Sequence, residues 1–179
     1  MTIKEKLYRK FAEHRFEKRY KRITKDVKRF NGFISNSKEY LILMPFDNEA
    51  FREAYSVALY LQLHKKNVSL IIFREFTNVF AEKKNYRFFV LKTRAFEEDL
   101  TLQEKLIAYL SDLDFDVFID LMPNETFFTK LLAMNTKAKY KIAVFERESE
   151  KLYDILLNEK PSNNLEKSFG NLLNSLQMF

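Results

Sequence analysis

The hydrophobic positions of the first thirty residues repeat with a helical period. Two stripes occur in succession, formed by Ile3, Leu7 and Phe11 and then by Phe16, Tyr20, Ile23, Val27 and Phe30. Steps of three and four residues place such side chains on one face of a helix. Gly32 follows the second stripe, and glycine commonly terminates helices. The pattern predicts an amphipathic helix within residues 1–33.

From residue 34 onward, short apolar runs alternate with longer segments of helical period. The apolar runs predict strands at 40–44, 68–73, 88–91, 116–121 and 140–145. The helical segments are predicted at 49–65, 102–112, 125–134 and 150–157 and from residue 165 to the end. Runs such as 40–44 and 68–73 are nearly continuous in apolar residues, as expected where helices cover both faces of a parallel sheet. The predicted fold class is α/β: one Rossmann-like three-layer domain over residues 34–179, with a mostly parallel five-stranded sheet.

The charge of the chain changes the picture of its first segment. The formal net charge is +6, but residues 1–30 hold twelve Lys or Arg against four Asp or Glu. The remaining residues hold 19 basic and 21 acidic side chains and are therefore slightly acidic. The basic character thus belongs to the N-terminal helix.

The composition excludes several kinds of active site. The chain has two glycines, no cysteine and two histidines. Phosphate-binding loops, dinucleotide-binding turns and nucleophile elbows all need several glycines. His14 and His64 lie on different predicted helices, so we expect neither a transition-metal site nor histidine-based nucleophilic catalysis. We predict no catalytic residue, no cofactor and no metal.

The longest apolar runs, such as 68–73, are too short to span a bilayer, and no secretory signal is recognisable. We therefore expect a cytoplasmic protein without a transmembrane segment. Peripheral attachment to the inner face of the membrane is an alternative location.

Two blocks of the sequence resemble a known enzyme family. The first runs from Tyr40-Leu-Ile-Leu-Met-Pro-Phe-Asp-Asn-Glu-Ala to Phe73, and the second contains Phe115-Asp-Val-Phe-Ile-Asp-Leu and Ala138-Lys-Tyr-Lys-Ile-Ala. Both are similar to the first lobe of family 9 glycosyltransferases, the lipopolysaccharide heptosyltransferases. The chain also resembles a short, uncharacterised bacterial family with a basic helix before a small α/β domain.

The glycosyltransferase resemblance implies two Rossmann-like lobes, the first for the acceptor sugar and the second for the ADP-heptose donor. A chain of 179 residues has room for the first lobe alone. The family carries a Gly-Asp pair in its first turn, whose carboxylate is the presumed catalytic base, but Glu49 and Ala50 stand there in this chain. We therefore expect a degenerate, non-catalytic lobe that serves as a binding or assembly module. The alternative is a glycosyltransferase component completed by a partner chain.

The fold class predicts where a ligand would bind. In an open α/β sheet, the crevice lies beyond the carboxyl ends of the strands where the strand order reverses. With the order 3-2-1-4-5, this position brings Asp47, Asn48 and Glu49 opposite Pro123, Asn124 and Glu125. A purely structural interpretation is that Asp47, Asn48 and Asn124 cap helices.

Four aspartates, Asp112, Asp114, Asp116 and Asp120, invite comparison with a hard-cation site. They lack the spacing and the glycine of a calcium loop. We interpret them as residues that end a helix, form a turn and flank a strand.

The cations of the first segment are its most distinctive feature, and we consider three explanations for them. The side chains could contact nucleic acid phosphates, or meet anionic lipid as part of an amphipathic helix. The third explanation is a solvated face on a helix that packs against its own domain. The residues concerned are Lys18, Arg19, Lys21, Arg22, Lys25, Lys28 and Arg29.

Overall fold

The computed structural model describes residues 3–25, 28–80, 85–91, 99–160 and 164–178. In this part of the chain, six parallel strands form one sheet in the order β3-β2-β1-β4-β5-β6. The strands are β1 (Glu39–Leu43), β2 (Asn67–Phe73), β3 (Tyr86–Leu91), β4 (Asp114–Asp120), β5 (Lys137–Phe145) and β6 (Ile155–Glu159). The order reverses between β1 and β4, where the common order 3-2-1-4-5 places the reversal.

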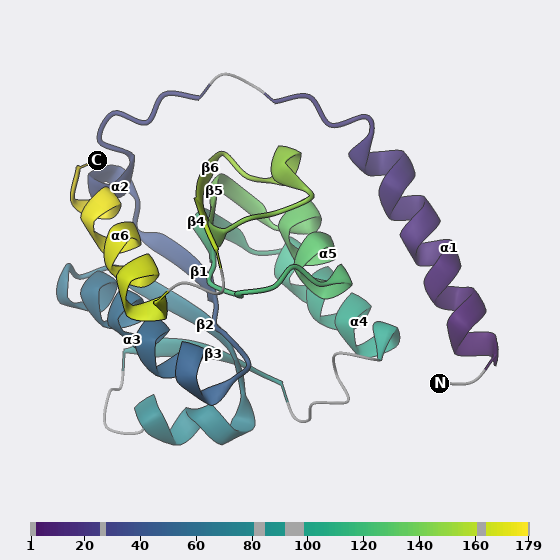
Figure 1. Cartoon of the computed structure of the whole chain (residues 1–179), viewed down its shortest axis with the longest axis horizontal. Coiled ribbons are helices and arrows are strands. Elements are labelled where there is room, and N and C mark those ends of the chain that lie inside the picture. Colours follow the sequence, from purple (N-terminus) through teal and green to yellow (C-terminus); the bar gives the residue numbers. More distant parts are fainter. Residues whose placement is uncertain (1–2, 26–27, 81–84, 92–98, 161–163, 179) are drawn as a thin grey trace.

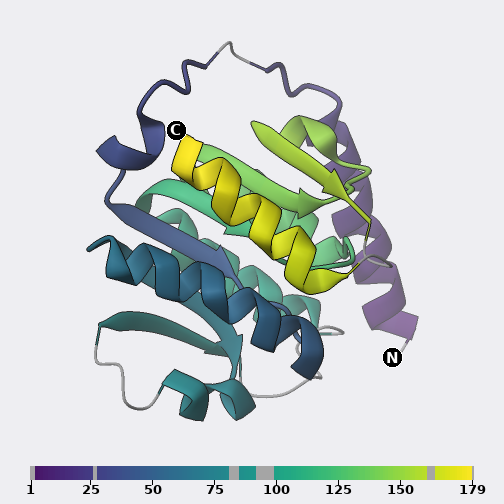
Figure 2. The ribbon, with the colours of Figure 1, turned by 60° about the vertical axis from the view of Figure 1, so that its left-hand side comes forward.

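Helices cover both faces of the sheet, which confirms the parallel α/β architecture (Figures 1 and 2). Helices α3 and α6 pack together on one face, and α4 and α5 pack together on the other, with α1 outside α5. The helices are α1 (Ile3–Tyr20), α2 (Phe33–Asn36), α3 (Asn48–Leu63), α4 (Leu100–Ser111), α5 (Phe127–Asn135) and α6 (Leu165–Met178). Two 3₁₀ segments, η1 (Arg74–Phe80) and η3 (Glu150–Leu152), complete the described elements.

The sixth strand corrects the predicted helix at 150–157. Residues 150–152 form a single 3₁₀ turn, and Ile155–Glu159 pairs with β5 at the edge of the sheet. Asp154 sets this path, because its backbone N–H donates to Lys141 O at 2.7 Å and its carboxylate accepts from Lys141 N at 2.8 Å. A short apolar run is compatible with either a helix or a strand, so the partner strand decides.

The N-terminal helix is shorter than predicted, since α1 ends at Tyr20. Beyond it, β-branched Ile23 and Thr24 favour helices weakly, and like charges such as Lys21 and Lys25 repel at a spacing of four. Val27 lies outside the described residues. Gly32 does not end a long helix. It takes φ +65° at the start of α2, a conformation that glycine adopts without strain.

An aromatic cluster fixes the segment that follows β2. Phe51 of α3 stacks on Phe76 of η1 with ring centroids 4.1 Å apart and meets Phe80 edge-on at 5.9 Å. Phe80 also contacts Tyr55 and Tyr86 at 5.1 and 5.0 Å. These contacts attach η1 to the sheet although its local sequence predicts no regular element.

One lysine of β5 is held in an environment that disfavours its charge. The Lys141 ammonium donates to the Ala133 carbonyl of α5. Burial lowers the pKa of Lys141 to about 8, and the carboxylate of Asp154 offsets only part of this effect. Between about pH 8 and the ordinary value of 10.5, the unfolded chain therefore holds a proton that the folded chain has released.

We expect Lys141→Met to stabilise the protein at pH 7 by about 1–3 kcal/mol, because it removes a charge that folding desolvates. The free energy of unfolding of the wild type should rise from pH 8 to 10.5, so the advantage of the variant should shrink across that window. Urea unfolding of both proteins at several pH values measures the difference. An advantage that stays constant with pH would contradict the buried-charge explanation.

Candidate functional site

A small cavity of about 280 Å³ lies at the carboxyl ends of β1 and β4, where the strand order reverses. Asp47, Pro123 and Asn124 line this cavity, and all three belong to the set that the strand-end rule brought together. Its other lining residues are Phe46, Phe73, Met122 and Thr126, so much of its wall is apolar. Asn48 and Glu49 are exposed and do not line this cavity, and Glu125 lines the neighbouring one.

Helix capping accounts for some of the polar side chains at this edge of the sheet. The Asp47 carboxylate accepts a hydrogen bond from Ala50 N at 2.9 Å and caps α3. The following helix, α5, begins at residue 127 and not at 125, because Thr126 and Thr129 cap it reciprocally. Asn48 and Asn124 are therefore not helix caps.

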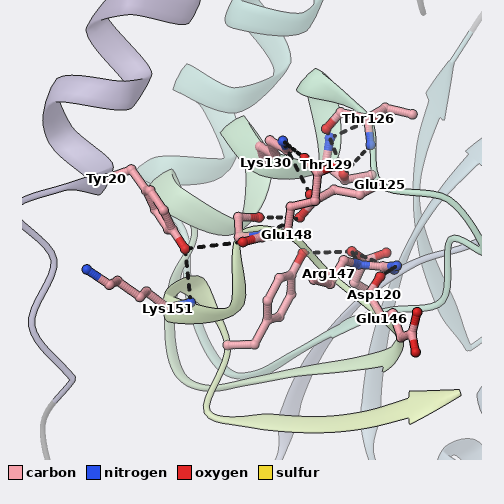
Figure 3. Close-up of polar contacts among 12 residues, drawn as sticks. Tyr20, Asp120, Glu125, Thr126, Thr129, Lys130, Glu146, Arg147, Glu148 and Lys151 are labelled. Atoms are coloured by element: carbon pink, nitrogen blue, oxygen red, sulfur yellow. Dashed lines mark hydrogen bonds and ion pairs between the residues drawn. The ribbon is translucent and has the colours of Figure 1, made fainter.

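A buried ion pair lies at the carboxyl ends of β4 and β5 (Figure 3). Asp120 ends β4, Arg147 follows β5, and the side chains of both are 0% exposed. Arg147 Nε lies 3.2 Å from Asp120 Oδ2, which also accepts from the Tyr153 hydroxyl at 2.7 Å. Asp120 Oδ1 accepts from Met122 N at 3.0 Å. Arg147 donates further to the carbonyls of Glu146 and Met122 at 3.0 and 2.5 Å.

The electrostatics of this cluster fix its protonation. Burial alone would lower the pKa of Arg147, but the charge of Asp120 and the hydroxyl of Tyr153 raise it above its ordinary value. Burial, followed by the Asp120 charge, raises the pKa of Tyr153 well above 10.0. Arg147 therefore stays a cation and Tyr153 a neutral donor. Both charges of this network are therefore paired within the fold.

A second polar cluster holds Glu125 in place (Figure 3). One Glu125 oxygen accepts from the hydroxyl of Ser149 and from its backbone N–H, the latter at 3.3 Å. The Lys130 ammonium lies 3.3 Å from the other oxygen, as an ion pair without hydrogen-bond geometry, and 3.0 Å from Glu148. Burial would lower the pKa of Lys130, but Glu148 and Glu125 raise it, so Lys130 is a cation. The Glu125 side chain is 7% exposed and is held by its neighbours.

An open polar cavity of about 610 Å³ lies beside these clusters. Its lining includes the acidic residues Glu125, Glu146, Glu148 and Glu150, and Arg147, whose buried side chain is paired with Asp120. Pro123, Asn124 and Asn158 complete the lining. This excess of carboxylates disfavours an anionic ligand such as a nucleoside diphosphate.

The second apolar stripe of the N-terminal segment, which begins at Phe16, packs against the domain. Phe16 is 4% exposed, contacts Phe127 of α5 edge-on at 5.9 Å and stacks on Tyr20 at 5.8 Å. The Tyr20 hydroxyl reaches Glu148 O at 3.5 Å, and Ile23 packs on the core. The second stripe, which was a candidate for membrane contact, is thus covered by the chain itself, whereas Leu7 and Phe11 of the first stripe are exposed.

The seven candidate cations divide into two groups. In the first group, Lys28 pairs with Asp154 at 2.8 Å and Arg19 donates to Asn135 at 3.1 Å. Arg29 is placed there by its backbone, because its carbonyl accepts from Tyr140 at 2.9 Å although its side chain is exposed. The other four are exposed and make no side-chain polar contact with the described residues. We call this second group, Lys18, Lys21, Arg22 and Lys25, the basic arm.

The four aspartates do not come together. Asp112 caps the C-terminal end of α4, Asp114 begins β4, and Asp120 ends it. Asp116 accepts from the backbone of Lys38 at 2.8 Å and pairs with Lys139 at 3.1 Å. Among the described residues, no three His, Cys, Asp or Glu side chains are grouped as a metal site would require.

Comparison with known proteins places the chain in a family. The sequence model of the family described as "Family of unknown function (DUF6913)" matches residues 6–179. The chain belongs to DUF6913. No curated protein matches this DUF6913 chain in sequence. Within the described part of this DUF6913 chain, no helix has the length and apolar character needed to cross a membrane.

The fold of this DUF6913 chain resembles that of a solved enzyme, described as the glycosyl transferase family 9 from Veillonella parvula DSM 2008. The structures agree with a TM-score of 0.58 over 78% of this chain, at 13% sequence identity. The match covers 41% of the other chain, so this chain spans less than half of that enzyme's length. At this identity the likeness concerns the fold.

Sequence reasoning missed the residues that dominate this edge of the DUF6913 fold, namely Arg147, Tyr153, Ser149 and Lys130. Arg147 follows β5 as Asp120 ends β4, so the strand-end rule applied to the fifth strand would have indicated it. Tyr153 and Ser149 carried no such signal, because they lie in the stretch predicted as a helix or next to it.

Proposed function

We propose that this protein is a non-catalytic binding module, built on a glycosyltransferase-like lobe, that engages an anionic partner through the basic arm. The observation that carries the proposal is the contrast between its two charged regions. Charged groups behind the strand ends are paired within the fold, whereas the cations of the arm are exposed and unpaired among the described residues.

The state of the strand-end carboxylates supports a non-catalytic role. A general base must reach the proton that it removes and be free to accept it. Asp47 caps α3, Asp120 is held by Arg147 and Tyr153, and Glu125 is held by Ser149 and Lys130. Ala50 stands in the place of the family's base, and Glu49, the carboxylate beside it, lies outside the cavity lining.

The position of the basic arm supports a binding role. Four cations within eight residues, without a side-chain partner among the described residues, create a local positive potential that attracts polyanions. The segment is anchored at Tyr20, which lies within it and reaches Glu148, and at Lys28, which follows it and pairs with Asp154. The arm is therefore presented by a fixed scaffold.

Heparin affinity chromatography tests the arm as a polyanion-binding surface. We expect Lys21→Glu/Arg22→Glu/Lys25→Glu to elute at a clearly lower salt concentration than the wild type, because three positive contacts become repulsive. Lys105→Glu/Lys137→Glu/Lys167→Glu is the matched control, with the same change in charge at exposed positions of the domain. Equal elution of the two triple variants would refute a localised binding surface.

A second candidate is a glycosyltransferase component completed by a partner chain, favoured by the family 9 fold. Thermal unfolding with a panel of nucleotide sugars and sugar acceptors tests it. A ligand at 100 times its Kd stabilises the native state by about 2.7 kcal/mol, which would raise Tm by several degrees. We expect a constant Tm, and a rise with any member of the panel would favour the enzyme.

A further inference from the structure

Helix α1 has two opposite faces, and only one is used by the fold. Ala12 and Phe16 are buried against the domain, and Tyr20 continues their line at steps of four. Leu7, Phe11, His14 and Lys18 follow each other at steps of four, three and four, and all are exposed. Leu7 and Phe11 are 56% and 59% exposed. Figure 1 shows α1 as the outermost element on its side of the molecule.

The charges around this outward face are mainly positive. Lys4, Lys10 and Lys18 are exposed on the same helix, and the basic arm continues directly from it. Of the acidic side chains described on α1, Glu13 pairs with Arg9 at 3.2 Å and Glu17 is exposed. Two large apolar side chains are thus surrounded by lysines.

We propose that the outward face of α1 is a docking surface for an anionic lipid bilayer. A helix lying in the membrane interface places apolar side chains at the boundary between headgroups and acyl chains while its lysines meet lipid phosphates. Leu7 and Phe11 supply the apolar contact, and Lys4, Lys10 and Lys18 supply the contacts with the lipid phosphates. The inference rests on the proposed role of the basic arm and adds an apolar contact to it.

Charge complementarity separates a bilayer from other occupants. A second copy of this chain would bring its own lysines against Lys4, Lys10 and Lys18, and such like charges repel. Nucleic acid would satisfy the lysines but would leave Leu7 without a suitable contact, since base recognition uses stacking and hydrogen bonds. An anionic bilayer uses both kinds of side chain.

Sedimentation of the full chain with phospholipid vesicles tests the proposal. We expect binding to phosphatidylglycerol-containing vesicles and little binding to phosphatidylcholine alone. Leu7→Ser/Phe11→Ser should lower the partition coefficient about tenfold or more while leaving the charge unchanged. The control Leu63→Ser/Val79→Ser removes two equally accessible apolar side chains elsewhere and should bind like the wild type, since these are 72% and 51% exposed.

Fluorescence gives a direct measure of insertion because the chain contains no tryptophan. The emission of Phe11→Trp should shift to shorter wavelength when phosphatidylglycerol vesicles are added, and that of Leu63→Trp should not. Absence of vesicle binding, equal binding by Leu7→Ser/Phe11→Ser, or no spectral shift at position 11 would each overturn the proposal. So would tighter binding to a DNA or RNA duplex that Leu7→Ser/Phe11→Ser leaves unchanged.

The heparin experiment separates this inference from the proposed function. Leu7→Ser/Phe11→Ser should elute from heparin like the wild type, because the basic arm is intact. Normal heparin retention without vesicle binding would overturn the membrane inference alone. If the wild type and the triple variant of the basic arm eluted from heparin at the same salt concentration, the proposed function would be overturned instead.

Discussion

Asp120→Asn should lower the free energy of unfolding by about 3–5 kcal/mol, because it leaves the buried Arg147 cation without its counter-charge. The side chains of both residues are 0% exposed, so no water can replace the lost carboxylate. The hydroxyl of Tyr153 also loses a charged acceptor. Urea unfolding followed by far-UV circular dichroism measures the change.

Three further variants make this expectation specific. Tyr153→Phe keeps the ion pair and should cost about 1–3 kcal/mol, the usual range for a hydrogen bond to a charged group. Asp112→Asn, at an exposed position, should stay within about 0.5 kcal/mol of the wild type. Asp120→Leu/Arg147→Met should be less destabilising than Asp120→Asn. A small effect of Asp120→Asn would mean that Arg147 finds another partner.

Phe51→Ala should cost about 3–5 kcal/mol, as expected for removal of a buried aromatic side chain. Phe51 is 1% exposed. Among the described residues of α3, only its ring contacts both Phe76 and Phe80. Its loss should also release η1, so hydrogen exchange of residues 74–80 should accelerate more than that of β4. Equal acceleration in both elements would indicate global unfolding without a local effect.

The matched control for this variant lies within the same 3₁₀ segment. Val79 is 51% exposed, so Val79→Ala should change the free energy of unfolding by no more than about 0.5 kcal/mol. A large effect there would show that η1 is stabilised by its own side chains and not by its contact with α3.

The central part of the fold could be predicted because its signals are local. Strands β1 and β2 are buried on both faces, so their sequences are nearly continuous apolar runs. The reversal between β1 and β4 lies where the common strand order places it. The placement of Asp47 opposite Asn124 rested on the same rule. Periodicity and topology were sufficient here.

The edge of the fold could not be predicted because distant contacts determine it. The strand at Ile155–Glu159 exists because Asp154 bonds to Lys141 on β5, and an Ile-Leu-Leu run alone does not distinguish a strand from a helix. Tyr20, the last residue of α1, contacts Glu148, which lies more than one hundred positions away in the sequence. Arg147 and Tyr153 come together with Asp120 only after β4 and β5 have paired.

The docking of α1 has a consequence for synthesis of the chain on the ribosome. Its partners are made late: Arg15 contacts Glu104, Arg19 contacts Asn135, and Tyr20 contacts Glu148. These pairs are separated by 89, 116 and 128 residues, so at about 5–20 residues per second α1 waits roughly 4–26 s for them. During that interval Phe16 is as accessible as Leu7 and Phe11. The nascent chain therefore offers chaperones a longer apolar surface than the finished protein does.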